Sequence, residues 1–421
     1  MSKIILHIDL NAFFVRCEEI ENPSLENKAV AIGHKGRGGI ISTCSYEARK
    51  YGVHSAMPTF QATKLCPNLI LLPGNYTLYS HKSKEFFNFV KRYSKIIEPA
   101  SIDECFVDMT TALKGEKDVV GYLKNMQQSL YKETGLKCSI GVAPTKFLAK
   151  MASDMKKPMG LTIIRRKDVR KMLDPLPIES FYGIGKKTSP KLREMGINTI
   201  GDLAKLINND DPQIKEVFGR FYFGIKDWIN GYGSDIVDTE PWDPKSIGNS
   251  ETLMFNTNNY DEIKDALLKI AKEVSERAIE ADKVGSTVQI VLKDSEMQET
   301  GFKTISRSKS LSKPVNDYPS IANAVISLLD ANYDESRPIR LVGVTLQNLI
   351  NRDEMVVQLS IFDNYEEIKE ECATKLLIGE LNRKMKKSVF KTASDALKDK
   401  KYGTDWCHWF IFPIPSSRER C

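Results

Sequence analysis

The chain has 421 residues, of which 41% are hydrophobic and 28% charged, and its formal net charge is +6. This length allows two to four domains, each with its own core, and the ordinary composition excludes a low-complexity chain. No apolar run approaches the roughly 20 residues that cross a bilayer, which argues against an integral membrane protein.

Residues 4–10 form a short apolar run rich in isoleucine, which is typical of a buried strand. Asp9 interrupts this run well before it reaches the length of a signal-peptide core. We therefore expect a cytoplasmic protein that starts with its first strand.

Residues 11–166 alternate between helical and strand patterns, which predicts a mixed sheet with helices on one face. Asn11 is expected to cap the first helix, and Gly52 and Gly135 mark the ends of later helices. The expected elements are a helix over 11–22, a strand and a helix within 36–53, a helix over 80–97, strand–turn–strand over 97–109, a helix over 119–135, a strand over 136–145, a helix over 146–160 and a strand over 161–166.

The pattern changes after residue 166. Residues 167–237 show small helices and turns without a strand pattern, and the Gly- and Pro-rich stretch 230–246 indicates a linker. A second α+β unit is expected at 247–350, followed by a polar tail with one helix at 351–421.

Cysteine spacing argues against a metal site. The eight cysteines include no CxxC pair, so we interpret them as reduced packing residues. A site made from Cys407, His408 and Cys421 would be one ligand short of the usual four.

Positive charge is concentrated in the N-terminal part. Residues 1–166 contain 24 Lys and Arg against 15 Asp and Glu, whereas the rest of the chain contains 37 against 40. This distribution favours a polyanionic ligand on the N-terminal part.

Two adjacent carboxylates, Asp103 and Glu104, occupy the turn expected within 97–109, and Asp9 ends the first strand. A pair of charges in a turn is most simply explained by solvation. If these strands are sheet neighbours, however, three carboxylates meet at one edge and need counter-charge. Two Mg²⁺ ions would supply it and would support an in-line phosphoryl transfer.

Three further residues are candidate phosphate ligands. Tyr46 and Arg49 are three residues apart on an expected helix and share a face. They offer a hydroxyl donor and a guanidinium fork. Lys157 precedes Pro158 at a helix end, where a long cation can reach into a cleft. Taken alone, each of them is more simply explained as an exposed polar residue.

Five motifs occur in a fixed order: HIDLNAFFVRCEEIENPSL, GIISTCSYEARKYGVHSAMP, ASIDECFVDM, CSIGVAPTKFLAKMASDMKKPMG and FYGIGKKTSPKLREMGI. Together they resemble the Y-family DNA polymerases, the translesion enzymes, over about residues 1–350. The resemblance implies a multidomain α/β (α+β) right-hand polymerase fold. Its parts would be a mixed-sheet palm (1–10 and 75–166), small fingers (11–74), a helix–hairpin–helix thumb (167–237), a linker (238–246), an α+β little finger (247–350) and a C-terminal tail (351–421).

The resemblance also implies an activity and a cofactor. The chain would add dNTPs to the 3′-hydroxyl of a primer on template DNA, with low fidelity, in DNA damage tolerance. It would use two Mg²⁺ ions, for which Mn²⁺ can substitute, bound by Asp9, Asp103, Glu104 and the carbonyl of Leu10. The nucleotide-binding residues would be Phe13, Phe14, Thr43, Tyr46, Arg49 and Lys157.

Phe14 corresponds to the family's steric gate, with Phe13 beneath the sugar. An aromatic ring against C2′ leaves no space and no hydrogen-bond partner for a ribose hydroxyl, so ribonucleotides are rejected. Without the family, both rings would be read as helix core. Ile40, Ile41 and Ser42 would form the roof over the nascent base pair.

Two regions are candidates for DNA contact. In GIGKKTSPKLREMGI, Gly183 and Gly185 would let the backbone approach a phosphate, with charge from Lys186 and Lys187, although a structural turn explains the glycines equally well. In SRSKSLSKP, serines alternate with Arg307, Lys309 and Lys313, so one face of a strand is basic. That suits contact with the DNA backbone. An ordinary solvated edge strand is the alternative.

The peptide QLSIF resembles the sequence by which bacterial polymerases bind the sliding clamp, their processivity factor. Its binding residues would be Gln358, Leu359, Ile361 and Phe362. The protein would act as a monomer, associated with the nucleoid when it is on DNA.

Two alternatives remain open from the sequence. One is another two-metal enzyme on a palm fold, either a nucleotidyl cyclase or a nuclease, and another is a non-catalytic protein that binds DNA and the clamp. The motifs also do not separate a polymerase IV-like chain from one resembling the polymerase V catalytic subunit.

Overall fold

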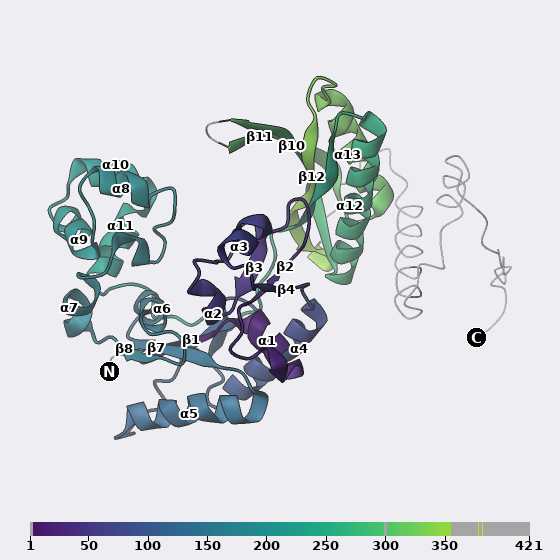
Figure 1. The fold of residues 1–421 in the computed structure, drawn as a ribbon. Coiled ribbons are helices and arrows are strands. Elements are labelled where there is room, and N and C mark those ends of the chain that lie inside the picture. Colours follow the sequence, from purple (N-terminus) through teal and green to yellow (C-terminus); the bar gives the residue numbers. More distant parts are fainter. Residues whose placement is uncertain (1–2, 299–300, 355–377, 379–380, 382–421) are drawn as a thin grey trace, which may run out of the picture. The chain divides into compact units, whose positions relative to one another are not determined.

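The computed structural model describes residues 3–298 and 301–354, together with residues 378 and 381. Its chain divides into two compact units, residues 1–244 with 252–256, and residues 245–251 with those from 257 on. Figure 1 shows the elements of each unit. Among the described residues, no helix is both long and apolar enough to cross a membrane.

A five-stranded sheet in the order β5-β6-β1-β7-β8 forms the centre of the first unit. β1 (Ile5–Leu10) pairs antiparallel with both β6 (Glu104–Asp108) and β7 (Cys138–Ala143). β5 (Ile97–Pro99) extends the sheet antiparallel beside β6, and β8 (Leu161–Ile163) extends it parallel to β7. The prediction of a mixed sheet is therefore confirmed.

Both faces of this sheet carry helices, so the expectation of helices on one face is wrong. Alternate β1 residues such as Leu6 and Ile8 pack into one core with α4 (Tyr76–Val90) and α5 (Val119–Thr134). The residues between them face α6 (Lys146–Met155), which packs on β7 and β1 from the other side (Figure 1). A sheet covered twice needs strands that are apolar on both faces, and β7 is buried at every position.

Helix α6 approaches β7 very closely at Gly141. A Cβ atom at this position would lie 2.0 Å from the carbonyl oxygen of Ala149 and 2.4 Å from the amide nitrogen of Ser153. Only a residue without a side chain allows this approach.

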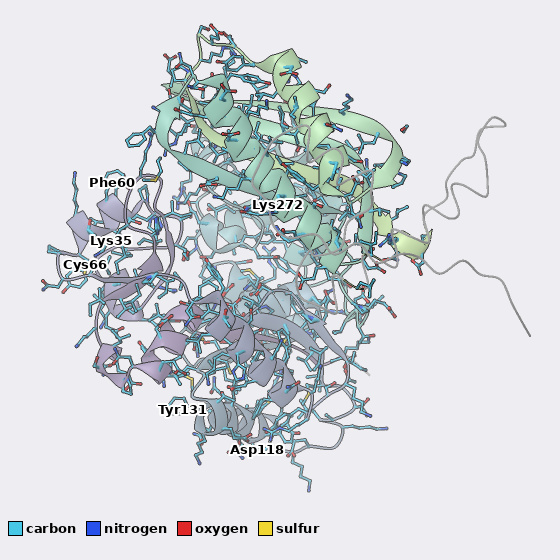
Figure 2. All side chains as sticks on the ribbon, turned by 90° about the vertical axis from the view of Figure 1, so that its right-hand side faces the viewer. Lys35, Phe60, Cys66, Asp118, Tyr131 and Lys272 are labelled. Atoms are coloured by element: carbon cyan, nitrogen blue, oxygen red, sulfur yellow. The ribbon has the colours of Figure 1, made fainter. Side chains whose placement is uncertain are left out.

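The helix ends follow their capping residues. α4 begins at Tyr76, after the side chain of Asn75 caps it, so it starts and ends earlier than the expected 80–97. Figure 2 shows Asp118, whose carboxylate caps α5, and Tyr131 in the last turn of that helix. α5 ends at Gly135 in the left-handed conformation (φ 73°), as expected.

Asn11 is not the cap of α1 (Phe13–Glu21), contrary to the prediction. The N-cap is Ala12, which has a left-handed backbone (φ 47°) and makes no side-chain capping bond. The buried side chain of Asn11 instead donates to Ser139 Oγ at 3.0 Å and accepts from the backbone N–H of Met159 at 2.8 Å. These tertiary hydrogen bonds replace the local one.

A separate small sheet in the order β3-β2-β4 lies between α1 and α4 in the sequence. It consists of β2 (Val30–Gly33), β3 (Ile41–Cys44) and β4 (Ile70–Leu72). With α2 (Tyr46–Arg49) and α3 (Thr59–Leu65), it encloses its own core.

As expected, no strand forms within residues 167–237, all of which the structure describes. Five helices pack into one core with α6. They are α7 (Val169–Leu173), α8 (Ser189–Glu194), α9 (Ile200–Asn208), α10 (Pro212–Phe218) and α11 (Tyr222–Ile229). Short 3-10 turns occur at Pro23–Leu25, Arg166–Asp168, Ile178–Ser180, Gly219–Phe221 and Arg352–Glu354.

The second unit contains a four-stranded sheet in the order β11-β10-β12-β9, with helices α12 and α13 on one face (Figure 1). Its α+β character agrees with the prediction for 247–350. The elements are β9 (Ser246–Thr257), α12 (Tyr260–Glu280), β10 (Lys283–Gln298), β11 (Gly301–Val315), α13 (Tyr318–Asn332) and β12 (Ile339–Asn351).

The cysteines of the described part are buried and free of disulfides, in agreement with the sequence. They are Cys17, Cys44, Cys66, Cys105 and Cys138. The hypothetical site at Cys407, His408 and Cys421, and the helix expected within the tail, lie outside the described residues apart from single positions.

Candidate active site

The register of β1 and β6 brings the three carboxylates of the sequence prediction together. Asp9 lies directly opposite Glu104 in the antiparallel pair. The backbone N–H of Leu10 donates to the carbonyl oxygen of Asp103 at 3.0 Å, which holds the turn against the end of β1. Strand pairing thus brings residues that are almost a hundred positions apart in the sequence to one edge of the sheet.

Asp103 and Glu104 differ in their electrostatic environment. Burial raises the pKa of Asp103, and the negative charges of Asp9 and Glu104 raise it further, while a hydrogen bond from Ser101 acts in the opposite direction. For Glu104, hydrogen bonding from His7 lowers the pKa to about 2, burial opposes this, and Lys150 lowers it further. The turn therefore holds one carboxyl group that resists ionisation beside one that ionises readily.

Two lysines supply the cations that these carboxylates require. Lys150 Nζ lies 2.7 Å from Glu104 Oε2 and 3.3 Å from Asp9 Oδ2. Lys157 Nζ lies 2.8 Å from Asp9 Oδ1 and 2.7 Å from Asp154 Oδ1. Lys157 was predicted as a phosphate ligand, and in this structure it is paired with Asp9 instead.

The pKa values of both lysines are raised. Burial alone would lower the pKa of Lys150, but the hydrogen bond to Glu104 and the charges of Asp154 and Asp9 outweigh it. Burial also acts to lower the pKa of Lys157, and the charges and hydrogen bonds of Asp9 and Asp154 raise it by more. Both ammonium groups are therefore held in the charged form.

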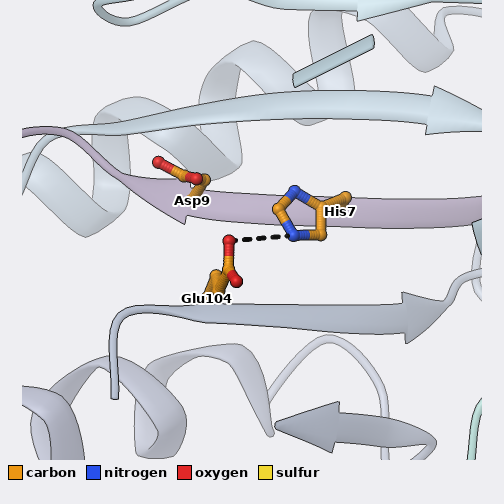
Figure 3. A group of neighbouring side chains, drawn as sticks. All are labelled: His7, Asp9 and Glu104. Carbon is orange, nitrogen blue, oxygen red and sulfur yellow. Dashed lines mark ion pairs between the residues drawn. The ribbon is translucent and has the colours of Figure 1, made fainter. Parts of the chain in front are cut away.

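The donor set fits a divalent metal ion. Potential ligand atoms of His7, Asp9 and Glu104 all lie within 4.8 Å of one another (Figure 3). Carboxylate oxygens are the ligands that Mg²⁺ and Mn²⁺ prefer. The two ammonium groups among them show that the carboxylates attract positive charge to this place.

Sequence reasoning missed three residues of this cluster, His7, Lys150 and Asp154. Two signals could have found them. His7 precedes Asp9 by two residues, so both lie on one face of the strand. Lys150 and Asp154 precede Lys157 by seven and three residues, spacings that return to one side of a helix.

Phe13 and Phe14 occupy different environments. Phe13 is 2% exposed and belongs to the core under the sheet. Phe14 is half-buried and stacks on Tyr79, with ring centroids 4.3 Å apart and an interplanar angle of 11°. The hydroxyl of Tyr79 donates to Glu18 at 2.7 Å, which fixes this supporting ring. Only Phe14 is thus available to a ligand.

Tyr46 and Arg49 share a helix face, as predicted. The guanidinium of Arg49 lies 4.8 Å from the centre of the Tyr46 ring. Burial raises the pKa of Tyr46, whereas Arg49 and Lys157 act in the opposite direction. The structure therefore places Tyr46 within electrostatic reach of both predicted cations. Thr43 lies half-buried on β3 nearby in sequence.

Ile41 does not share a surface with Ile40 and Ser42. Its side chain is fully buried in the core of the small sheet, whereas Ile40 is 53% exposed and Ser42 is exposed. Neighbouring residues of a strand point to opposite faces. Of the three residues predicted to form the roof, Ile40 and Ser42 are therefore the two with exposed side chains.

The predicted thumb residues are all exposed. Gly183 has a φ of 101°, and no atom would contact a Cβ added to Gly183 or Gly185. The backbone is thus open at this turn, just before α8 and beside the exposed Lys186 and Lys187.

The alternation along β11 is present, but its basic face is the one that carries the helices. Arg307 and Lys309 lie opposite Ile290 and Val288, which are buried. Opposed residues of an antiparallel pair point to the same face, and Lys309 indeed donates to Ser327 of α13 at 2.9 Å.

The open face of this sheet is polar around Ser308 of β11. Ser308 lies opposite Gln289, which donates to it at 3.4 Å and accepts from Gln347 at 3.1 Å. Lys313 follows an irregularity in the pairing, so this register does not fix its face. The predicted clamp residues Gln358, Leu359, Ile361 and Phe362 lie outside the described residues.

Comparison with known proteins agrees with this geometry. The impB/mucB/samB family model matches residues 8–154, the model of its C-terminal domain matches 244–361, and the family's HHH motif matches 166–197. The chain is 38% identical over 400 residues to DNA polymerase IV of Bacillus velezensis, covering 94% of each protein. It is 40% identical to DNA polymerase IV of Listeria monocytogenes, covering 83% of this chain and 96% of the relative.

A solved structure, a Y-family DNA polymerase chimera of Dbh and Dpo4, matches with a TM-score of 0.70 and 27% identity, covering 83% of this chain and 99% of that one. The fold and the acidic site thus define a multidomain polymerase with a helix–hairpin–helix segment and a C-terminal little-finger domain.

The chain belongs to the impB/mucB/samB family, the Y family of DNA polymerases. Enzymes of this class are DNA-directed translesion polymerases with metal-dependent catalysis, and their substrates are DNA and deoxynucleoside triphosphates. The cyclase, nuclease and non-catalytic alternatives are thereby set aside, and the relatives named above are DNA polymerases IV.

Proposed function

We propose that the chain adds single dNTPs to a primer 3′-hydroxyl with two Mg²⁺ ions bound by Asp9, Asp103, Glu104 and the Leu10 carbonyl, Mn²⁺ being a substitute. The observation that carries this proposal is the convergence of Asp9 and Glu104 on two lysine ammonium groups, with the carboxyl group of Asp103 electrostatically coupled to both acids. Carboxylates so close together bind cations strongly. When bound, the two ions would lower the pKa of the primer hydroxyl and neutralise the triphosphate.

The residues of the chain would bind and orient the substrates. Lys157, now on Asp9 and Asp154, would pair with the triphosphate beside Arg49 and Tyr46, since phosphate oxygens offer the same negative charge as the carboxylates. Phe14, supported from behind by the Tyr79 ring, would stand against C2′ of the sugar. Thr43 would add a hydroxyl contact, and Ile40 and Ser42 would cover the base pair.

The domain assignment supports these roles. The five-stranded sheet with α4, α5 and α6 would be the palm, the small sheet with α2 and α3 the fingers, α7–α11 the thumb, and the second unit the little finger. Duplex DNA would contact the open turn at Gly183–Gly185 with Lys186 and Lys187, and the edge strand with Arg307, Lys309 and Lys313. The peptide at 358–362 would bind the sliding clamp of a monomeric polymerase in the nucleoid.

Primer extension tests the proposal. The purified chain, given primer–template DNA, Mg²⁺ and one dNTP at a time, should add complementary nucleotides, and Asp103→Ala should abolish addition while leaving DNA binding intact. The variant Asp118→Ala, which changes an exposed aspartate at the start of α5, is the matched control. Addition by Asp103→Ala at the wild-type rate would contradict the metal assignment.

A further inference from the structure

Asp154 contacts both lysines of the carboxylate cluster but has no part in the function proposed above. It lies in the last turn of α6, and its side chain is 46% exposed, against 14% for that of Asp9. Asp154 Oδ1 lies 2.7 Å from Lys157 Nζ, and its Oδ2 lies 3.7 Å from Lys150 Nζ. Both partners are three or four residues away in the sequence, so these contacts are local.

Asp9 contacts the same two lysines from the sheet. Its Oδ1 lies 2.8 Å from Lys157 Nζ, and its Oδ2 lies 3.3 Å from Lys150 Nζ. Each carboxylate oxygen of Asp9 therefore already has an ammonium group as its partner. Because an ammonium group and a divalent ion repel each other at such distances, an ion that binds Asp9 must displace at least one of the two lysines.

Lys157 is the lysine that can leave Asp9 at the lower cost. Lys150 is also held by Glu104, at 2.7 Å, whereas among the described residues only Asp9 and Asp154 form ion pairs with Lys157. When an ion replaces it on Asp9, Lys157 keeps its ion pair with Asp154. Without Asp154, the same displacement would leave this half-buried ammonium group with no carboxylate partner, which costs free energy.

We propose that Asp154 is a positioning residue for Lys157: it retains the ammonium group when a divalent ion replaces it on Asp9, and so keeps Lys157 where it would meet the triphosphate. The inference rests on the proposed function, which places the ion on Asp9 and Lys157 on the nucleotide. Asp154 suits this role because it is the more exposed of the two aspartates, and an exposed ion pair is weak. The ammonium group can then also bind phosphate oxygens, which accept the same charge-assisted hydrogen bonds.

The test measures Mn²⁺ binding to the full-length chain without DNA, from the electron paramagnetic resonance signal of the free ion. Asp154→Asn removes the charge and keeps the size of the side chain, Lys157→Met removes the ammonium group, and a double variant carries both changes. Asp174→Asn is the matched control. Asp174 pairs with a basic residue four positions away, Arg170 at 3.1 Å, but at the end of α7.

The Mn²⁺ dissociation constant of Asp154→Asn should rise about two- to five-fold, the range that a partly exposed ion pair contributes. That of Asp174→Asn should equal the wild-type value. Lys157→Met should bind Mn²⁺ more tightly than the wild type, because the competing ammonium group is gone. In the Lys157→Met background, Asp154→Asn should have little further effect, since its partner is absent.

Two results would overturn the inference. If Asp154→Asn weakens Mn²⁺ binding equally in both backgrounds, Asp154 acts on the ion itself and not through Lys157. If Lys157→Met binds Mn²⁺ no more tightly than the wild type, Lys157 does not compete with the ion. The second result holds even if the Asp154 variant fails to fold.

Single-nucleotide addition at saturating Mg²⁺ gives a second readout. Asp154→Asn should raise the KM for dNTP about two- to five-fold, with little change in kcat, because it loosens a residue that would bind the triphosphate. The same change should add nothing in the Lys157→Met background. A fall in kcat at constant KM would contradict a role in holding Lys157.

Asp9→Asn separates this inference from the proposed function. It should weaken Mn²⁺ binding whatever the role of Asp154. If Asp9→Asn binds Mn²⁺ as tightly as the wild type, the metal is not held at the carboxylate cluster and the proposed function fails. If Asp9→Asn weakens binding while Asp154→Asn behaves as the wild type does, only the role of Asp154 fails.

Discussion

The ammonium nitrogen of Lys150 lies 2.7 Å from the carboxylate of Glu104, so a cation of the protein itself occupies the acidic edge of the sheet. Lys150→Met should destabilise the metal-free protein, because it removes an ammonium group from two largely buried carboxylates, and only Asp9 keeps a second one, that of Lys157. The expected loss is about 1–3 kcal/mol. Mg²⁺ should restore more stability to the variant than to the wild type, since no ammonium group competes with the ion.

Thermal unfolding in EDTA and in Mg²⁺ measures this effect. Lys156→Met, at an exposed position of the same segment, is the control and should respond to Mg²⁺ as the wild type does. Equal stabilisation of the Lys150→Met protein and the wild type by Mg²⁺ would show that Lys150 and the metal do not occupy the same place.

Asp103 and Glu104 should have opposite effects on the stability of the metal-free protein. The pKa of Glu104, about 2 in the folded state, is below its unfolded value of about 4.3. Its contribution is therefore present above the unfolded pKa and is lost as the pH falls toward 2. Glu104→Gln should cost on the order of 2 kcal/mol at neutral pH, allowing for partial exposure, and should weaken the loss of stability in acid.

For Asp103 the sign is reversed. Its pKa is raised in the folded state, so ionisation destabilises the protein as the pH rises through that value. Asp103→Asn should stabilise the metal-free protein at neutral pH. Urea denaturation in EDTA across acidic to neutral pH measures both variants, and a shift of the same sign for the two would refute the assignment.

Asn11→Ala should impair nucleotide binding, although the proposed nucleotide site does not include the Asn11 side chain. The Asn11 side chain accepts a hydrogen bond from the backbone of Met159, two residues after Lys157. Its loss leaves that half-buried N–H unpaired, at a cost of about 1–3 kcal/mol, and frees the turn that carries Lys157. The KM for dNTP should rise several-fold, with a smaller change in kcat.

Steady-state single-nucleotide addition measures both constants for Asn11→Ala. Asn22→Ala, which removes an exposed capping side chain at the other end of α1, is the control. A fall in kcat at constant KM would indicate that Asn11 acts on the carboxylates rather than on Lys157.

Phe14→Ala should admit ribonucleotides. The ring is the only one of the adjacent pair that is available to a ligand, and removing it opens space for a 2′-hydroxyl. Discrimination between dNTP and NTP, measured as the ratio of kcat/KM values, should fall by at least about ten-fold. Tyr76→Ala, which removes an exposed ring packed edge-on against Phe14, should retain most of it. Unchanged sugar selectivity in Phe14→Ala would mean that another residue is the gate.

Arg307→Ala should weaken primer–template binding through lost charge. Because the residue would contact phosphate, the slope of log K against log salt should become shallower by about one ion, and equally on different DNA sequences. Ser308→Ala, which changes the neighbouring uncharged residue on the opposite face of β11, should not change the slope. A sequence-dependent loss in Arg307→Ala would argue for base contact instead.

Strand and helix patterns predicted much of this fold because each element shows its period locally. β1, β6 and β7 were expected near their observed positions, and so were the helices ending at Gly135 and beside Lys157. The three acidic residues could be grouped because two lie at one turn. Which residue of β6 lies opposite Asp9 depends on the register of the two strands, and this register is seen only in the structure.

The errors arose where distant contacts override a local signal. Asn11 has the chemistry of a cap but bonds to Ser139 and Met159, which are far away in the sequence. The second layer of helices on the sheet was missed because α6 also covers the core of α7–α11, and its pattern does not reveal which sheet face it takes. His7 and Lys150 show only their spacing from Asp9 and Lys157 in the sequence, and the role of a buried histidine or a helix lysine depends on the groups that it faces in the fold.

The missing side chain at Gly141 sets the distance between α6 and the carboxylate cluster. Because β7 lacks a side chain there, α6 lies against the sheet, and Lys150 and Ser153 come within reach of Asp9 and His7 on β1 from one short stretch of helix. Any larger residue would move these two groups outward together, while Asp9, Asp103 and Glu104 stayed in place. The distance between the α6 groups and the carboxylates of the sheet is thus set by a position outside the proposed substrate contacts. A change of metal preference in a laboratory-evolved variant could begin at that single buried glycine.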